Sequence, residues 1–268
     1  MDREDDGRAP TTGRFVEHEA RGAVLAELHA RPFLPIDLPQ RVYHFAFVTD
    51  EEEARADRAA LAELIRSHML PPPAGDAKFQ RLTIGDWRLR WEQHTEFTTY
   101  TWSTQKNAGE PFVHPDPLGS GEIAFRPPGR LIVAAHLCAV EGGHSHDVYA
   151  QLFNSQSLCV VRAVKGGAHV LTDFAVDPFG FTRLLARTAG IGALEAGRLI
   201  QRVLEIETYR SMALLGLPEA RRAGPQLHAM ESEISGITQA LNERHDMRAS
   251  RDLLERSSDL LARSEALA

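Results

Sequence analysis

The sequence has few cysteines and no long apolar segment. Cys138 and Cys159 are the only two cysteines in 268 residues, and each lies in an apolar stretch, which favours buried thiols over a disulfide. The longest strongly apolar run, 131–140, is about half of the roughly 20 residues that a membrane-spanning helix needs. The acidic start, 1–6, lacks the basic and apolar parts of a secretory signal. We therefore predict a cytoplasmic chain that does not cross a bilayer.

Positive charge is also scarce. The chain has 30 basic residues against 37 acidic ones, and its net charge is -7. The sequence has no cluster of basic residues beyond the pair Arg221-Arg222. Because nucleic-acid binding depends on such clusters, we predict that the protein does not bind DNA or RNA. The only lysines are Lys78, Lys106 and Lys165. The dominance of arginine suits forked contacts to carboxylate and phosphate, although a GC-rich coding sequence explains it equally well.

Catalytic motifs are missing as well. The sequence contains no glycine-rich phosphate loop, no nucleophile elbow, no CxxC pair and no HExxH. These absences favour a protein that is not an enzyme, and we predict no cofactor.

Alternation and apolar runs predict strands in the first two thirds of the chain. A first helix from residue 14 must end before Pro32. A second helix begins after Thr49 or Asp50, either of which is a good N-cap before the three glutamates 51–53. The predicted strands are 42–48, 79–84, 87–94, 96–102, 131–140, 158–164 and 168–176.

Helical spacing replaces the strand pattern after Asp177-Pro178. Leu184 and Leu185 open this pattern, and Pro218 breaks or kinks the helix. An apolar seam with heptad spacing follows, interrupted around residues 242–250. Its residues are Leu227, Met230, Ile234, Ile237 and Leu241 before the interruption, and Met247, Leu254 and Leu261 at steps of seven. We predict a flexible segment 1–13, a mixed-sheet α/β or α+β head over 14–187, and an all-helical stalk over 188–268.

Six polar residues form a candidate pocket in the head. His29 and Arg31 would close the first helix as cations. Alternatively, Arg31 would hold a carboxylate or phosphate while His29 acts as a proton carrier or ligand. Glu92, His94 and Glu96 would share one face of a continuous strand, either as a solvated charged face or as an acid–base or metal arrangement. Asp173 completes the set.

Two further groups of polar residues have weaker claims to function. His144 and His146 follow Gly142-Gly143 and are weak metal candidates, with an exposed polar loop as the alternative. A structural polar network is predicted on the most apolar helix, where buried charges need partners; its members are Arg198, Glu205, Glu207, Tyr209 and Arg210. A ligand pocket at the same place is the alternative.

Four segments carry a family resemblance: 29–33 (HARPF), 92–97 (EQHTEF), 172–174 (TDF) and, above all, 197–210 (GRLIQRVLEIETYR). They resemble a bacterial family of predicted membrane-anchored proteins of unknown function, domain of unknown function 3422. The resemblance implies an α/β head on a helical stalk facing the cytoplasm and no assigned reaction. Family members are usually longer and continue to an apolar anchor that this sequence does not reach.

Three functions stay open from the sequence. The first is a non-enzymatic scaffold or regulator, whose open helical seam binds a second copy or a protein partner, peripheral to the inner membrane. The second is a small-molecule or metal-binding protein, hydrolytic in one version, that uses the six-residue pocket. The third and weakest is the cytosolic head of an assembly for cation transport, which rests on an architectural analogy alone.

Overall fold

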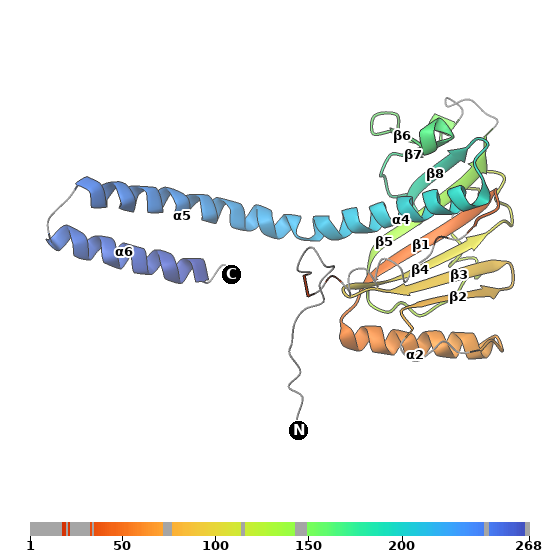
Figure 1. The fold of residues 1–268 in the computed structure, drawn as a ribbon, viewed down its shortest axis with the longest axis horizontal. Coiled ribbons are helices and arrows are strands. Elements are labelled where there is room, and N and C mark those ends of the chain that lie inside the picture. The colour runs from red at the N-terminus through yellow and green to blue at the C-terminus, as the bar shows by residue number, and fades with distance from the viewer. Residues whose placement is uncertain are drawn as a thin grey trace, which may run out of the picture. The chain divides into compact units, whose positions relative to one another are not determined.

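The head is an α+β structure built on one mixed sheet of eight strands (Figure 1). The computed structural model describes residues 18–19, 21, 33, 35–71, 77–113, 116–142, 149–243 and 247–265. The strands are β1 (Gln40–Val48), β2 (Phe79–Ile84), β3 (Trp87–Gln93), β4 (Phe97–Thr104), β5 (Arg130–Glu141), β6 (Cys159–Ala163), β7 (Ala168–Thr172) and β8 (Thr182–Thr188), in the order β2-β3-β4-β1-β5-β8-β7-β6.

Helix α2 (Glu51–Ser67) covers one face of the sheet with an aromatic core. Asp50 caps the helix as expected, because its side chain accepts from the Glu53 amide and the Glu53 side chain accepts from the Asp50 amide. Leu61 and Ile65 are fully buried against rings from three strands and one connecting segment. Those rings belong to Tyr43, Phe45, Phe47, Trp87, Trp91, Tyr100, Trp102 and Phe181.

Helix α4 (Ala193–Leu215) covers part of the opposite face. Ile200 and Leu204 pack on small side chains of the central strands, among them Ala46, Ala135 and Ala186. Alanine at these positions lets a helix backbone approach the sheet closely, so the apolar layer here is thinner than under α2.

The helical pattern predicted to begin at Leu184 and Leu185 is wrong, because these residues lie in strand β8. The segment Thr182–Thr188 pairs parallel with β5 and antiparallel with β7. Because Leu184 and Leu185 lie in different core clusters, this strand is buried on both faces. A short apolar run of that kind does not distinguish strand from helix by periodicity.

The other predicted strands are confirmed to within a few residues, and the hairpin 158–176 is shorter than expected. The first predicted helix before Pro32 lies outside the described residues. Pro218 does stand at a helix boundary: α4 ends at Leu215, Gly216 forms a turn, and α5 (Leu217–Glu243) begins one residue before it.

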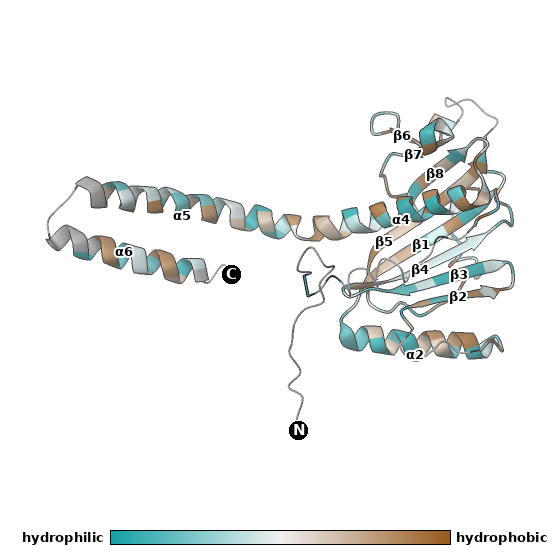
Figure 2. Cartoon of the chain, viewed as in Figure 1, coloured by the Kyte–Doolittle hydropathy of each residue, from teal (hydrophilic) through white to brown (hydrophobic). Residues whose placement is uncertain are grey.

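The chain divides into two compact units, Met1–Thr208 and Tyr209–Ala268. In the second unit, α5 packs against α6 (Met247–Glu265), and together they are called the helical hairpin below. Met230, Ile237 and Leu253 are buried in it. Figure 2 shows further apolar positions recurring among hydrophilic ones along both helices. Within the described ranges, no helix combines the length and hydropathy that crossing a membrane requires.

Candidate functional site

A cleft of about 460 Å³ lies between α4 and the β6–β7–β8 end of the sheet. It is called the α4 cleft below. Its volume is in the range of pockets that hold drug-sized ligands. The lining is mainly apolar and comes from both walls: Cys159, Val161, Ala163, Val164, Val170, Thr172, Phe174 and Leu184 on the sheet side, and Glu195, Arg198, Leu199, Arg202, Val203, Ile206 and Glu207 on α4.

The helical wall follows from the spacing of its residues. The seven α4 residues recur at steps of three and four, so they form one face of the helix. Leu199 and Val203 pack on β7 near Ala168 and Val170, whereas Ile206 stays 67% exposed. The cleft exists because α4 covers the central strands and leaves the β6 end of that face open.

His44 fixes the helical wall to the sheet. Its Nδ1 lies 2.8 Å from the Thr101 hydroxyl and its Nε2 lies 2.9 Å from the Thr208 hydroxyl. Because the Thr208 hydroxyl donates to the Leu204 carbonyl, it accepts from Nε2–H, and Nδ1 accepts from Thr101. Burial, aided by the positive charge of Arg90, lowers the pKa of His44 to about 3. The imidazole is therefore neutral and acts as a fixed connector at neutral pH.

A second polar link joins α4 to β3. The Arg90 guanidinium donates to the Gln201 side chain at 2.6 Å and to the Glu92 carboxylate at 2.8 Å. Gln201 also donates to Glu205, one turn further along α4. Glu92, one of the sequence candidates, thus takes part in positioning the helix.

Two arginines border the α4 cleft. Arg198 and Arg202 lie one turn apart, are exposed, and place their guanidinium carbons 5.1 and 5.9 Å from the ring centre of Phe33. Glu195 is exposed on the same face, whereas Glu207 is only 4% exposed. The cleft therefore combines an apolar interior with a border rich in guanidinium donors.

The predicted polar network falls into separate places. Arg198 and Glu207 line the α4 cleft, and Glu205 bonds to Gln201. Tyr209 and Arg210 belong to the second compact unit. The proposal that all five residues form one network stays a prediction.

The structure does not bring the described members of the six-residue pocket together. Strand β3 ends at Gln93, and residues 94–96 turn the chain into β4, so Glu92 and Glu96 do not share a continuous strand. His94 stacks on Phe97 in this turn, with ring centres 4.1 Å apart. Asp173 follows β7, five strand positions from β3, which is roughly 24 Å at about 4.8 Å per strand.

The remaining candidates lie outside the described residues: His29, Arg31, His144 and His146. Within the described residues, no three His, Cys, Asp or Glu side chains are grouped as a metal ion would require. Asp173 itself is buried and caps a turn, because it accepts from the amides of Asn154 and Ala175.

Arg198 and Glu207 were candidates from the sequence, but the other residues that line the cleft were not. Cys159 had been noted only as a buried thiol, and Arg202 had not been singled out. Both cysteines are described, both are free, and they occupy opposite faces of the sheet. Only the helical spacing of 195, 198, 202 and 206 could have indicated a shared face.

Comparison with known protein families gives one match. The family model described as Protein of unknown function (DUF3422) matches residues 16–268. The chain belongs to this family, as its sequence segments indicated. No curated protein and no solved structure matches it.

Proposed function

We propose that the head binds a small apolar molecule carrying one anionic group, and that the α4 cleft is its site. The observation that carries this proposal is the largely apolar cleft of about 460 Å³ with Arg198 and Arg202 at its border. An apolar body would fill the space beside Val161, Val170 and Val203. The anionic group would then meet the two guanidinium groups, which bind carboxylate or phosphate with two hydrogen bonds each.

The shape of the site favours a ligand with an extended apolar part. Most of the lining offers no hydrogen-bond partner, so a polar molecule would lose hydration there without compensation. The polar groups gather on α4, at residues 195, 198, 202 and 207. This separation matches a molecule with one charged end, such as a medium-chain fatty acid.

Cys159 provides a direct test. It lines the cleft, whereas Cys138 lies on the other face, where burial raises its thiol pKa to about 12 and keeps it unreactive. We expect a thiol reagent to label one cysteine quickly in the native protein. Decanoate should slow that labelling in a saturable way, and decanol should do so more weakly.

Matched variants complete the test. Replacing both Arg198 and Arg202 by Gln should weaken the protection by decanoate about tenfold or more, because charge-assisted hydrogen bonds are lost. Arg130→Gln, an exposed change at the start of β5, is the control and should leave protection unchanged. Labelling of Cys159 that decanoate does not slow, or double-variant protection equal to that of the control, would contradict the proposal.

A second candidate function is supported by the helical hairpin. Leu227 and Ile234 on α5, and Leu254 and Leu261 on α6, repeat every seven residues and are 50–69% exposed. These rows are the part of the predicted seam that the α5–α6 contact leaves open. They favour a scaffold or regulatory role in which the hairpin associates with another helical surface.

We commit to a second copy of the hairpin as the occupant. Arg263 of α6 pairs with Glu233 of α5 at 3.0 Å, so the two helices already have complementary charges. Pairing α5 of one copy with α6 of another would repeat this complementarity and bury both apolar rows, as in a four-helix bundle.

Light scattering of the full chain tests self-association. We expect a dimer that becomes a monomer when Leu254 and Leu261 are both replaced by Ser. Ser257→Ala and Ser264→Ala together are the control on the same helix. A wild-type monomer would contradict self-association, and wild-type binding to anionic lipid vesicles without dimerisation would favour peripheral membrane association instead.

A further inference from the structure

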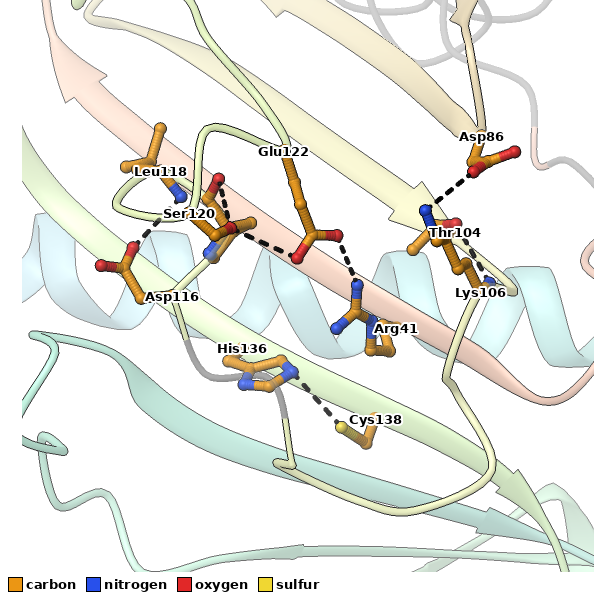
Figure 3. A network of polar contacts seen from close by, with 11 residues as sticks. Arg41, Asp86, Thr104, Lys106, Asp116, Leu118, Ser120, Glu122, His136 and Cys138 are labelled. Atoms are coloured by element: carbon orange, nitrogen blue, oxygen red, sulfur yellow. Dashed lines mark hydrogen bonds and ion pairs between the residues drawn. The ribbon is translucent and has the colours of Figure 1, made fainter.

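A group of buried nitrogen atoms lies on the α2 side of the sheet, opposite the α4 cleft. Tyr43, His136 and Arg183 are direct neighbours across β1, β5 and β8. Arg41 stands beside this row, across from Cys138. Figure 3 shows Arg41 directed at Glu122 of the 105–129 connection, with His136 and Cys138 nearby on β5. We call Arg41, His136 and Arg183 the arginine–histidine cluster.

Arg41 is only 1% exposed, yet most of its guanidinium is unmatched. Its Nη2 donates to Glu122 at 3.0 Å, and the group lies 5.5 Å from the Trp87 ring centre and 5.9 Å from that of Tyr43. Among the residues that the structure describes, Nε and Nη1 of Arg41 and Nε of Arg183 have no hydrogen-bond partner. A buried cation left in this condition is costly, so a further acceptor is expected.

His136 adds a donor to the same place. It is fully buried and stacks on Tyr43 with ring centres 4.2 Å apart. Its Nε2 lies 3.4 Å from Cys138 Sγ, which also accepts from the Phe112 amide. Because burial raises the pKa of Cys138 to about 12, the thiol keeps its proton and directs it to Nε2.

The tautomer of His136 follows from that bond. With Nε2 as acceptor, the neutral imidazole carries its hydrogen on Nδ1. Burial, with the charges of Arg41 and Arg183, lowers the pKa of His136 to about 3 and keeps it neutral. Nδ1 has no partner within the described ranges. All the unmatched atoms of the cluster are therefore donors.

We propose that the arginine–histidine cluster is a binding site for an oxyanion, the carboxylate or phosphate group of a small molecule. Donors from two guanidinium groups and one imidazole match an acceptor-only ligand. The rings of Phe112 and Phe181 lie 5.2 and 6.4 Å from the His136 ring and shield the site from water. Glu122 and Asp173 each pair with one arginine and leave Arg41 Nε and Nη1 and Arg183 Nε without a hydrogen-bond acceptor among the described residues.

This site is independent of the α4 cleft. It lies on the other face of the sheet and shares no residue with the cleft. Either proposal can therefore fail without the other.

Thermal unfolding of the full chain with inorganic phosphate or acetate tests the oxyanion site, with chloride at matched ionic strength as reference. We expect one of the two anions to raise Tm in a saturable way, because a ligand that binds only the native state stabilises it. The anion that acts distinguishes a phosphate site from a carboxylate site.

Three variants identify the site. His136→Phe keeps an aromatic ring but removes Nδ1–H. Arg183→Gln removes the positive charge of a side chain that is 27% exposed. Each variant should lower the affinity for the anion about tenfold or more. Glu122→Gln should strengthen anion binding, because it removes a negative charge that competes for Arg41. Arg130→Gln is the control and should change nothing.

The expected failures are equally specific. Equal Tm in phosphate, acetate and chloride would overturn the proposal. So would unchanged anion affinity in Arg183→Gln and Glu122→Gln, which tests the idea even where His136→Phe fails to fold. The proposal would also be overturned by a structure from crystals grown with the stabilising anion in which only water lies beside Arg41.

Discussion

The two faces of the sheet use different side chains to bury the same strands. The α2 face has large rings and three buried charged groups, Arg41, Asp57 and Asp173. On the α4 side, alanine, valine and leucine make up most of the layer, and His44, Glu92 and Glu207 are also buried there. Large rings fill a thick layer between helix and sheet, and the polar groups buried beside them need hydrogen-bond partners. Small side chains let the helix lie closer to the sheet.

The difference explains why each face presents a different kind of site. On the α2 side, polar groups are trapped between rings and the 105–129 connection, as in the arginine–histidine cluster. On the α4 side, the helix covers only the strands with small residues and leaves an apolar cleft at the β6 end. One sheet thus offers a buried polar site and an open apolar one.

Asp57 should show the largest effect on the α2 face. Its carboxylate accepts from Trp91 Nε1 at 2.7 Å and from the Tyr100 hydroxyl at 2.6 Å. Asp57→Ala leaves both buried donors unmatched and should lower the free energy of unfolding by about 2–5 kcal/mol in a urea titration. Asp57→Asn should cost less, because the amide oxygen can accept from Trp91 Nε1 while Nδ2 donates to the Tyr100 oxygen. A loss below about 1 kcal/mol in the alanine variant would contradict this account.

Acid should weaken both faces through one histidine on each. The pKa of His44 and of His136 is lowered from 6.5 to about 3, chiefly by burial. Between these pH values the unfolded chain binds protons that the native protein does not. The free energy of unfolding should therefore fall with decreasing pH, by up to about 1.4 kcal/mol per unit for each histidine.

A variant separates this slope from that of other titrating groups. His44→Gln should remove one histidine's share of the slope between pH 6.5 and 4, measured by urea titration at each pH. His68→Asn, an exposed position after α2, should keep the full slope. A His44→Gln slope equal to that of the wild type would show that His44 is not buried as a neutral group.

Thr208→Val tests how firmly α4 is held. The change keeps the shape of the side chain but removes the hydroxyl that accepts from His44. We expect a loss of about 1–2 kcal/mol in the free energy of unfolding and faster amide exchange along 199–208. Thr238→Val on α5, where the exposed hydroxyl bonds only its own helix, is the control and should change stability by less than about 0.5 kcal/mol.

Gln201→Ala should have the smallest effect. It removes the contacts to Arg90 and Glu205, which are partly exposed, so water replaces them and the loss should be about 0.5–1 kcal/mol. Gln226→Ala on α5 serves as the neutral control. If Gln201→Ala lowered the free energy of unfolding more than Thr208→Val in urea titration, the Arg90–Gln201 link would be the stronger of the two and this ranking would be wrong.

Local patterns were enough to predict most of the fold. The alternation of Trp87, Leu89 and Trp91 with charged residues marked β3, and Asp50 with Glu53 marked the start of α2. The strand β8 escaped because its residues are apolar towards both faces. The break between the strands predicted at 87–94 and 96–102 is confirmed as the turn at 94–96, so Glu92 and Glu96 do not lie on one continuous strand.

The candidate sites were much less predictable. Cys159 and Arg202 are 43 positions apart and meet only because α4 returns across the sheet. Arg41, His136 and Arg183 carry no shared motif, and strand order alone makes them neighbours. Glu92 and Asp173 of the six-residue pocket are far apart for the same reason, because one lies on β3 and the other follows β7, at distant positions in the sheet.

Local sequence patterns predict the two kinds of region, a sheet-containing head and a helical end, because periodicity and capping act between residues that are close in the chain. The sequence also determined the family, through a continuous segment on α4. The tertiary structure decided which strands are adjacent and where α4 stops covering the sheet, because these depend on the sizes of side chains packed from distant parts of the chain. Both proposed sites follow from that packing.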